Sequence, residues 1–208
     1  EKYATITYIA GKYLALLFFP HPLSYDYSYN QIPIINWANL KAVFSFLVLA
    51  GISIYAIINI RKKSIIAYGI LFYLITFSIV SNVVFNIGAP MGERFIYLSS
   101  LGFCLCLSVL LAKLLKVRTE NGFNYNIKWL LPLLLIVSTA SYATVTRNKV
   151  WKNNLTLYET DVKTASNSAR THMYYGVALI NRYGKKPESE MLNTAINELR
   201  KAVEINPR

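Results

Sequence analysis

The stretch LKAVFSFLVLAGISIYAIINIRKK, residues 40–63, decides the fold class of this protein. Its apolar part, from Leu40 to Ile60, is close to the ~20 residues that a helix needs to cross ~30 Å of hydrocarbon. Three basic residues at 61–63 end it abruptly. Backbone polar groups inside lipid must bond within their own segment, so this stretch predicts a membrane-spanning helix.

Four further apolar blocks of similar length predict further membrane helices. Hydrophobic residues make up 54% of the chain and charged residues 15%, whereas soluble domains carry about 25% charged residues. We therefore expect an all-α fold, a polytopic membrane bundle of about five transmembrane helices over residues 1–146. The other four blocks are approximately Ala4–Pro20, Ile65–Ile87, Phe95–Leu115 and Trp129–Val145.

The basic residues indicate how the helices are oriented. The net charge is +12, but the positive side chains sit mostly at the ends of apolar blocks, which indicates membrane orientation and no nucleic-acid partner. The 61–63 loop and the loop flanked by Lys113, Lys116, Arg118 and Lys128 fall on one side if helices alternate. The positive-inside rule makes that side cytoplasmic. Loops 21–39 and 88–94, and everything after about Thr146, then face outward.

Three basic residues, Arg147, Lys149 and Lys152, lie just outside the last apolar block and oppose this orientation. A folded domain that follows can be translocated regardless of nearby charge, so we keep the assignment. The expected location is a multi-pass protein of a prokaryotic plasma membrane rather than the endoplasmic reticulum. The C-terminal part is expected on the extracytoplasmic side.

The composition changes after Thr146, where polar helical sequence begins. We expect a junction helix in 147–168 and a tetratricopeptide-repeat (TPR) helix-turn-helix in 169–208. Small residues at Gly176, Ala195 and Ala202 let two helices approach closely, and Pro207 ends the second one. The turn at 184–187 makes this repeat about seven residues longer than usual. A single repeat cannot bury its apolar face, so further repeats are expected beyond Arg208, with a protein acceptor or partner bound by the array.

The candidate site residues lie near the outward loops. Arg94 can hold a lipid phosphate by bidentate hydrogen bonds, with Glu93 beside it. The alternative is that Arg94 reaches ordinary headgroups and Glu93 caps a helix. Lys12, within an apolar block, is a functional candidate or a side chain that reaches the membrane surface.

The outward loop 21–33 carries a second group of candidates. Asp26 with His21 can perform acid–base chemistry or bind a metal, and the alternative is a solvated or turn-forming role. Tyr25 and the other tyrosines favour the headgroup level. Cys104 and Cys106 are too closely spaced on a helix to form a metal or redox pair, so we expect packing or lipid-facing roles and no metal site in this chain.

Two loop motifs resemble one protein family. The stretch Leu17–Ser28 (LFFPHPLSYDYS) is similar to the signature loop of the transmembrane and tetratricopeptide-repeat O-mannosyltransferases and their prokaryotic relatives. The stretch Met91–Cys104 (MGERFIYLSSLGFC) resembles the Glu-Arg segment of the same family. Trp151, followed by Leu157-Tyr158 and Ser168-Ala169, resembles its junction to the repeats. The resemblance covers nearly the whole chain in the expected order.

This resemblance implies part of a GT-C type membrane glycosyltransferase. Such an enzyme moves a sugar, mannose in the family, from a polyprenyl-phosphate donor to a protein Ser or Thr hydroxyl at the outer face. The resemblance places the catalytic acid in a loop upstream of Glu1, so this piece alone is expected to be inactive. It places Arg94, Glu93 and Lys12 near the donor phosphate. No cofactor is implied with certainty, although the parent protein can use a divalent metal.

Two rival functions remain open at the level of sequence. A non-enzymatic membrane scaffold would use its repeats to bind partner proteins in their concave face. A transporter is the third hypothesis, but the helices show neither the internal repeat nor the paired broken helices that many transporters have.

Overall fold

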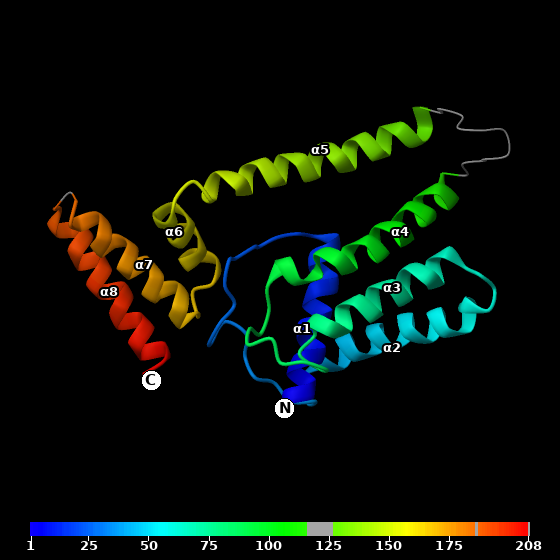
Figure 1. Cartoon of the computed structure of the whole chain (residues 1–208), viewed down its shortest axis with the longest axis horizontal. Helices are drawn as coiled ribbons and strands as arrows, with labels where there is room; N and C mark the ends of the chain where they lie inside the picture. The colour runs from blue at the N-terminus through cyan, green and yellow to red at the C-terminus, as the bar shows by residue number, and fades with distance from the viewer. Residues whose placement is uncertain (116–126, 186, 208) are drawn as a thin grey trace.

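The computed structural model describes residues 1–115, 127–185 and 187–207, with side chains for all of these except 127–129. All regular elements in these ranges are helical, as the sequence predicts (Figure 1). Their bounds are α1 Lys2–Phe18, α2 Leu40–Ile60, α3 Ile65–Val80, η1 Glu93–Ile96, α4 Tyr97–Leu114, α5 Ile127–Val150, α6 Asn154–Thr164, α7 Ala169–Tyr183 and α8 Ser189–Ile205.

Three helical segments in the described ranges are long and apolar enough to cross a membrane. They are Leu40–Ile60, Glu93–Leu114 and Leu130–Val150. The expectation of about five spans is therefore too high by this measure. α3 is apolar but has 16 residues, which at 1.5 Å per residue cover only about 24 Å. α1 has 17 residues and is equally short.

α3 ends at Val80 rather than near Ile87, where the apolar block ends. Asn82 takes a positive φ of 60°, a conformation that Asn tolerates and that stops a helix. Its side-chain amide then organises the loop that follows. Asn82 Nδ2 donates to the Ala89 carbonyl at 2.9 Å, and Asn82 Oδ1 accepts from the Ile87 amide at 3.0 Å.

α5 differs from prediction in the opposite direction, since it continues about five residues past the end of its apolar block. Arg147 and Lys149 therefore lie in its last turn and not in a connecting segment. Cations at a helix C-terminus interact favourably with the unpaired carbonyl groups there. Two of the three basic residues that seemed to oppose the orientation, Arg147 and Lys149, thus have a local structural reason to be present.

The long helices run back and forth between two ends of the molecule (Figure 1). The loop after α2, with its basic residues 61–63, and the C-terminal end of α4 share one end. Loops 19–39 and 81–92 and helices α6 to α8 share the other end. The assignment of residues 61–63 to the cytoplasmic side assumed that successive helices alternate in direction in this way. Lys116, Arg118 and the side chain of Lys128, which also entered that argument, lie outside the described residues.

α1 does not run beside the other long helices but crosses them at the end occupied by loops 19–39 and 81–92 (Figure 1). Tyr13 of α1 packs edge-on against Phe77, near the end of α3, with ring centroids 5.3 Å apart. Phe18 packs against Phe103, near the start of α4, at 4.8 Å. α1 is thus a cross-piece that closes this end of the bundle.

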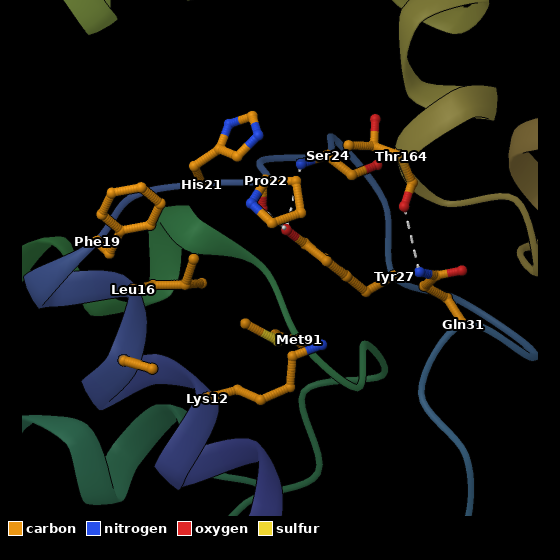
Figure 2. Close-up of a pocket in the computed structure, with 11 residues that line it drawn as sticks. Lys12, Leu16, Phe19, His21, Pro22, Ser24, Tyr27, Gln31, Met91 and Thr164 are labelled. Atoms are coloured by element: carbon orange, nitrogen blue, oxygen red, sulfur yellow. Dashed lines mark hydrogen bonds between the residues drawn. The ribbon is translucent and has the colours of Figure 1, made fainter.

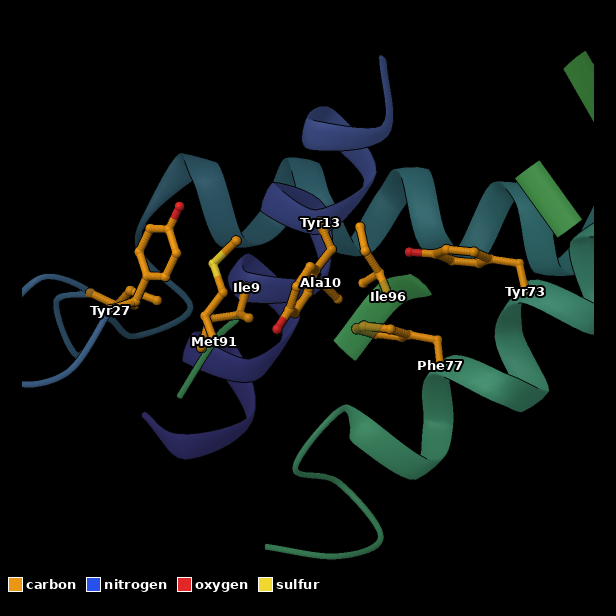
Figure 3. Close-up of a cluster of buried hydrophobic side chains, with 9 residues drawn as sticks. Ile9, Ala10, Tyr13, Tyr27, Tyr73, Phe77, Met91 and Ile96 are labelled. Atoms are coloured by element: carbon orange, nitrogen blue, oxygen red, sulfur yellow. The ribbon is translucent and has the colours of Figure 1, made fainter. Parts of the chain in front are cut away.

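The buried core lies under this cross-piece. It is a cluster of nine buried residues from α1, α3, η1 and the two loops, in which Tyr13 sits between Met91 and Ile96 (Figure 3). Elsewhere α2 and α5 leave most side chains exposed, as helices that face lipid do. The cluster consists of Ile9, Ala10, Tyr13, Tyr27, Ile32, Tyr73, Phe77, Met91 and Ile96.

The α7 and α8 helices pack side by side as the predicted helix-turn-helix. Gly176 is the point of closest approach, because a Cβ there would lie 2.7 Å from Leu199 Cγ. Ala195 and Ala202 are buried in the same interface. The pair also buries a polar contact that the sequence did not reveal. His172 Nδ1 lies 2.5 Å from Glu198 Oε2, and Lys201 Nζ lies 2.9 Å from Glu198 Oε1.

Glu198 makes the stability of this helix pair depend on pH. Burial alone would raise the pKa of Glu198, but hydrogen bonds from Lys201 and His172 outweigh burial and hold the pKa below its ordinary value of 4.5. A depressed carboxyl pKa stabilises the folded state above the unfolded-state pKa. That stabilisation is lost as the pH falls through the folded-state pKa.

We therefore expect hydrogen-exchange protection of the α8 amides to be constant near neutral pH and to fall below about pH 4.5. Glu198→Gln should be less protected at pH 7 and should flatten this dependence. Equal pH profiles for the two proteins would show that another group controls the transition.

Candidate functional site

A pocket of about 260 Å³ lies at the end of the bundle that α1 closes (Figure 2). The signature loop passes over it, and α1 forms its floor. One part of the lining is apolar, from Ala15, Leu16, Phe19, Pro22 and Met91. The other part is polar, from Lys12, His21, Ser24, Tyr27, Gln31 and Thr164. The site therefore combines apolar contacts and a cationic side chain, Lys12, in one cavity.

Lys12 brings the positive charge into this pocket (Figure 2). Its Nζ lies 5.7 Å from the centre of the Tyr27 ring and 5.9 Å from that of Tyr8. The faces of aromatic rings attract a cation at such distances. The structure therefore directs Lys12 toward the pocket and the tyrosines around it.

Glu93 faces the signature loop rather than capping a helix. Its Oε1 accepts a hydrogen bond from the Tyr27 hydroxyl at 2.6 Å and one from the Ser24 amide at 3.0 Å. Burial raises the pKa of Tyr27 above its usual value, and the bond to Glu93 raises it further, so the phenol remains a donor. Glu93 thus shapes one wall of the pocket.

Tyr13 sets the position of Glu93 from the α1 side. Its hydroxyl accepts from the Gly92 amide at 2.8 Å and lies 3.1 Å from the Gly92 carbonyl, to which it donates. Both polar groups of one backbone residue are therefore satisfied by a single buried side chain. This contact connects positions 79 residues apart and anchors the Glu-Arg motif against α1.

Arg94 lies outside the pocket lining. Its guanidinium is exposed and sits over the Phe95 ring, 5.1 Å from the ring centre. The Glu93 carboxylate is turned toward the loop, so the two neighbours do not form an ion pair within the described residues. Lys12 thus lines the cavity and Glu93 accepts hydrogen bonds from two lining residues, Ser24 and Tyr27, whereas Arg94 is left on the surface.

Asp26 and His21 are not brought together. Asp26 accepts from Ser28 through both carboxylate oxygens, at 2.7 and 2.9 Å, and from the Ser168 hydroxyl at 3.1 Å. Arg170 Nη1 lies 3.5 Å from Asp26 Oδ1. His21 is exposed, against the Phe19 ring. These contacts favour the turn-forming alternative for Asp26.

Tyr25 packs into an aromatic cluster with the C-terminal helices. Its ring lies 5.2 Å from that of Tyr158 on α6 and 6.2 Å from that of Tyr174 on α7, and those two rings stack at 5.5 Å. Burial raises the pKa of Tyr25. The tyrosines of the loop therefore divide between the pocket and the C-terminal helices.

A buried ion pair, unforeseen from the sequence, holds the loop in place. Asp161 of α6 is fully buried and accepts two hydrogen bonds from Arg147, at 2.9 and 3.2 Å. Asp161 Oδ2 also accepts from the Tyr25 amide at 2.6 Å. The two charges are 14 residues apart on separate helices, a spacing that carries no pattern in the sequence.

Cys104 and Cys106 are free, and Cys106 Sγ lies 3.4 Å from the Ile66 carbonyl in the α3–α4 contact. Within residues 1–115, 127–185 and 187–207, no group of three or more His, Cys, Asp or Glu side chains is placed to hold a metal ion.

Comparison with known proteins identifies relatives that match most or all of the chain. The chain is 28% identical to Protein O-mannosyl-transferase TMTC1 of Homo sapiens over 214 aligned residues. This alignment covers 100% of this chain and 23% of TMTC1. Protein O-mannosyl-transferase TMTC3 of Homo sapiens is 26% identical over 182 residues, covering 85% of this chain and 19% of its own. Protein O-mannosyl-transferase TMTC4 of Homo sapiens is 26% identical over 173 residues, and the alignment covers 80% of this chain and 23% of TMTC4.

This chain spans about a quarter or less of the length of these curated relatives. No family model matches it, and no solved structure does. The alignments nevertheless confirm the resemblance carried by the two loop motifs: the chain is homologous, along its whole length, to the family of protein O-mannosyl-transferases.

Proposed function

We propose that this chain is the donor-binding part of a membrane glycosyltransferase that moves a sugar, mannose by its relatives' name, from a polyprenyl phosphate to a protein Ser or Thr hydroxyl. The observation that carries the proposal is the pocket in which the Lys12 ammonium meets the apolar side chains of α1. A polyprenyl phosphate has the same two features, an anionic head on an apolar chain. Its head would pair with Lys12, and its chain would leave along Leu16 and Phe19 toward lipid.

The position of the pocket supports this assignment. It lies at the end of the bundle opposite the basic residues 61–63, and the C-terminal helices begin beside it (Figure 1). With residues 61–63 in the cytoplasm, the pocket opens on the extracytoplasmic side of what we take to be a prokaryotic plasma membrane. A lipid-bound donor and a soluble acceptor held by the repeats would then meet there. Bringing two reactants together contributes much of the catalysis in such a reaction.

Each charged residue of the site has a separate role in this proposal. Lys12 contacts the phosphate, and Arg94, exposed beside the pocket, receives the headgroup as it enters. Glu93 holds the wall formed by Ser24 and Tyr27. The resemblance to the family implies that the catalytic acid belongs to a loop outside this chain. In this proposal the pairing of the donor phosphate with Lys12 contributes to the affinity, and the catalytic acid performs the chemistry.

Lys12→Ala in the full-length protein should weaken binding of polyprenyl phosphate about tenfold or more. A hydrogen bond to a charged group is worth about 1.5–3 kcal/mol, and 1.4 kcal/mol is a factor of ten. Binding to protein in nanodiscs and mannose transfer from polyprenyl-phosphate mannose to a Ser/Thr peptide are the measurements. Arg94→Ala should lower turnover by a smaller factor, because its side chain is more exposed.

Lys2→Ala is the matched control, since Lys2 is an exposed lysine on the same helix. It should bind donor and transfer sugar like the unmodified protein. Undiminished binding by Lys12→Ala would remove Lys12 from the site. Absence of any transfer by the full-length protein, with peptide binding retained, would favour a membrane-anchored scaffold.

A further inference from the structure

One wall of the pocket has no regular secondary structure and is held by two carboxylates from opposite sides. On the bundle side, Glu93 accepts from the Ser24 amide and the Tyr27 hydroxyl. On the other side, Asp161 accepts from the Tyr25 amide at 2.6 Å and lies 3.4 Å from the Ser24 hydroxyl. The segment 24–27, which we call the pocket wall, is therefore suspended between the membrane bundle and α6.

Asp161 is enclosed by protein and fully paired. Its side chain is 0% exposed, and Arg147, at the end of α5, supplies two hydrogen bonds to it. Removing a carboxylate from water is costly unless it is paired and its oxygens are satisfied. Arg147 supplies the charge, and the wall supplies the remaining donors. Asp161 thus joins the end of α5, the helix α6 and the pocket wall at one point.

A second set of contacts connects the same loop to the start of α7. The Ala169 amide donates to the Tyr29 carbonyl at 2.7 Å, and the Asn30 amide donates to the Asn167 carbonyl at 2.8 Å. Asp26 accepts from the Ser168 hydroxyl, and Ser168 is the N-cap of α7. The loop therefore places an acid at the N-terminus of α7, where negative charge is favoured. α6 in return places an acid on the loop.

We propose that Asp161 is a positioning residue that couples the orientation of the first helix pair to the shape of the donor pocket. The wall cannot move away from Lys12 without breaking its bonds to Asp161. The helix α7 cannot turn without pulling on residues 26–30 of the same loop. Energetic coupling of this kind is reciprocal, so a ligand that orders the wall also strengthens the α7 junction. The name of the ligand rests on the proposed function, but the coupling does not.

Hydrogen exchange of the full-length protein in nanodiscs tests the coupling directly. Asp161→Asn should lower protection of the amides in residues 24–31 about tenfold to a hundredfold, because buried donors lose a charged acceptor and 1.4 kcal/mol is a factor of ten. Protection within α8 should be unchanged, which would show that the helix pair is still folded. Glu159→Gln, on the exposed side of the same helix, should change neither region.

A milder variant keeps the test decisive if Asp161→Asn does not accumulate. Arg147→Lys retains the charge but cannot make both bonds of the guanidinium fork, so the same amides should lose protection by a smaller factor. Loop protection equal to that of the unmodified protein in the variants that fold would overturn the proposal. So would a loss of protection spread evenly over α7 and α8.

Ligand binding supplies a readout that a purely structural role would not produce. Polyprenyl phosphate added to the unmodified protein should raise protection at Asn30 and Ala169, and this increase should be absent in Asp161→Asn. The KM for the lipid donor should rise about tenfold in the variant while kcat stays within about twofold, as expected where only ground-state positioning is lost. If polyprenyl phosphate does not bind the unmodified protein, the proposed function fails. The loss of loop protection in Asp161→Asn still decides whether Asp161 holds the pocket wall.

Discussion

Gly102→Ala is expected to disrupt the contact between α3 and α4. A Cβ at position 102 would lie 2.3 Å from the Gly69 carbonyl oxygen and 2.9 Å from the Tyr73 amide nitrogen. Both atoms belong to the backbone of α3, so neither can turn aside as a side chain does. Small residues allow membrane helices to approach this closely, and packing then replaces the hydrophobic effect as the source of their association.

The disruption should extend beyond the two helices in contact. Tyr73 stacks on Phe77 at 5.6 Å, and both belong to the buried cluster that supports the pocket. We expect a loss of at least about 3 kcal/mol, the upper part of the usual range for overpacking. Thermal unfolding in detergent should show the midpoint lowered by about 6–12 °C for a chain of this length.

Gly51→Ala is the matched control for this experiment. Gly51 is also a helical glycine in a membrane segment, but a Cβ there would meet nothing within 4 Å. Alanine is the better helix former by about 1 kcal/mol, so the midpoint should stay level or rise. Equal midpoints for Gly102→Ala and Gly51→Ala would mean that α3 and α4 are not in close contact.

The second large effect is expected at Gly176→Ala, in the contact between α7 and α8. The added Cβ would lie 2.7 Å from Leu199 Cγ and 3.2 Å from the Ala195 carbonyl oxygen. Leu199 can shift in part, but the backbone of α8 cannot, so we expect a cost of about 2 kcal/mol. Hydrogen exchange of the α8 amides should then become about thirty times faster, since this helix pair can open on its own.

Gly184→Ala, at the end of α7, controls for the removal of a glycine. Its nearest neighbours would lie 3.7 and 3.9 Å from the new Cβ, which is ordinary contact. Its φ is −59°, a value that alanine adopts freely, so the substitution should be neutral or stabilising by about 0.4–1 kcal/mol. Exchange rates that rise equally in both variants would contradict a tightly packed helix pair.

Local patterns predicted the helices well where a helix depends on its own residues. Leu40–Ile60 was expected and observed with the same bounds, because apolar length and a basic stop are properties of the segment itself. The early end of α3 was missed, since it depends on an Asn that takes a positive φ and closes a loop. The orientation of α1 was also missed, because an apolar block has the same composition whether it spans a bundle or crosses its end.

The candidate site shows the same division. Glu93 and Lys12 were selected from the sequence by charge at membrane depth and by motif. The structure places Lys12 in the pocket lining and bonds Glu93 to the lining residues Ser24 and Tyr27. Arg94 was selected on the same grounds, but the turn of η1 leaves it on the surface. Asp161 and Arg147 could not be found, because a buried ion pair between two helices leaves no periodic signal in either of them.

The sequence by itself determined that this protein is helical, that it belongs in a membrane and that a helix pair follows the bundle, because hydrophobic length and helical periodicity act over neighbouring residues. The tertiary structure decided where the pocket lies and which charged side chains face it. It also decided that the signature loop is hydrogen-bonded to the C-terminal helices. Those features arise from contacts between residues up to 142 positions apart. Such contacts are set by packing and by the need to pair buried charge, and neither is written in any single segment.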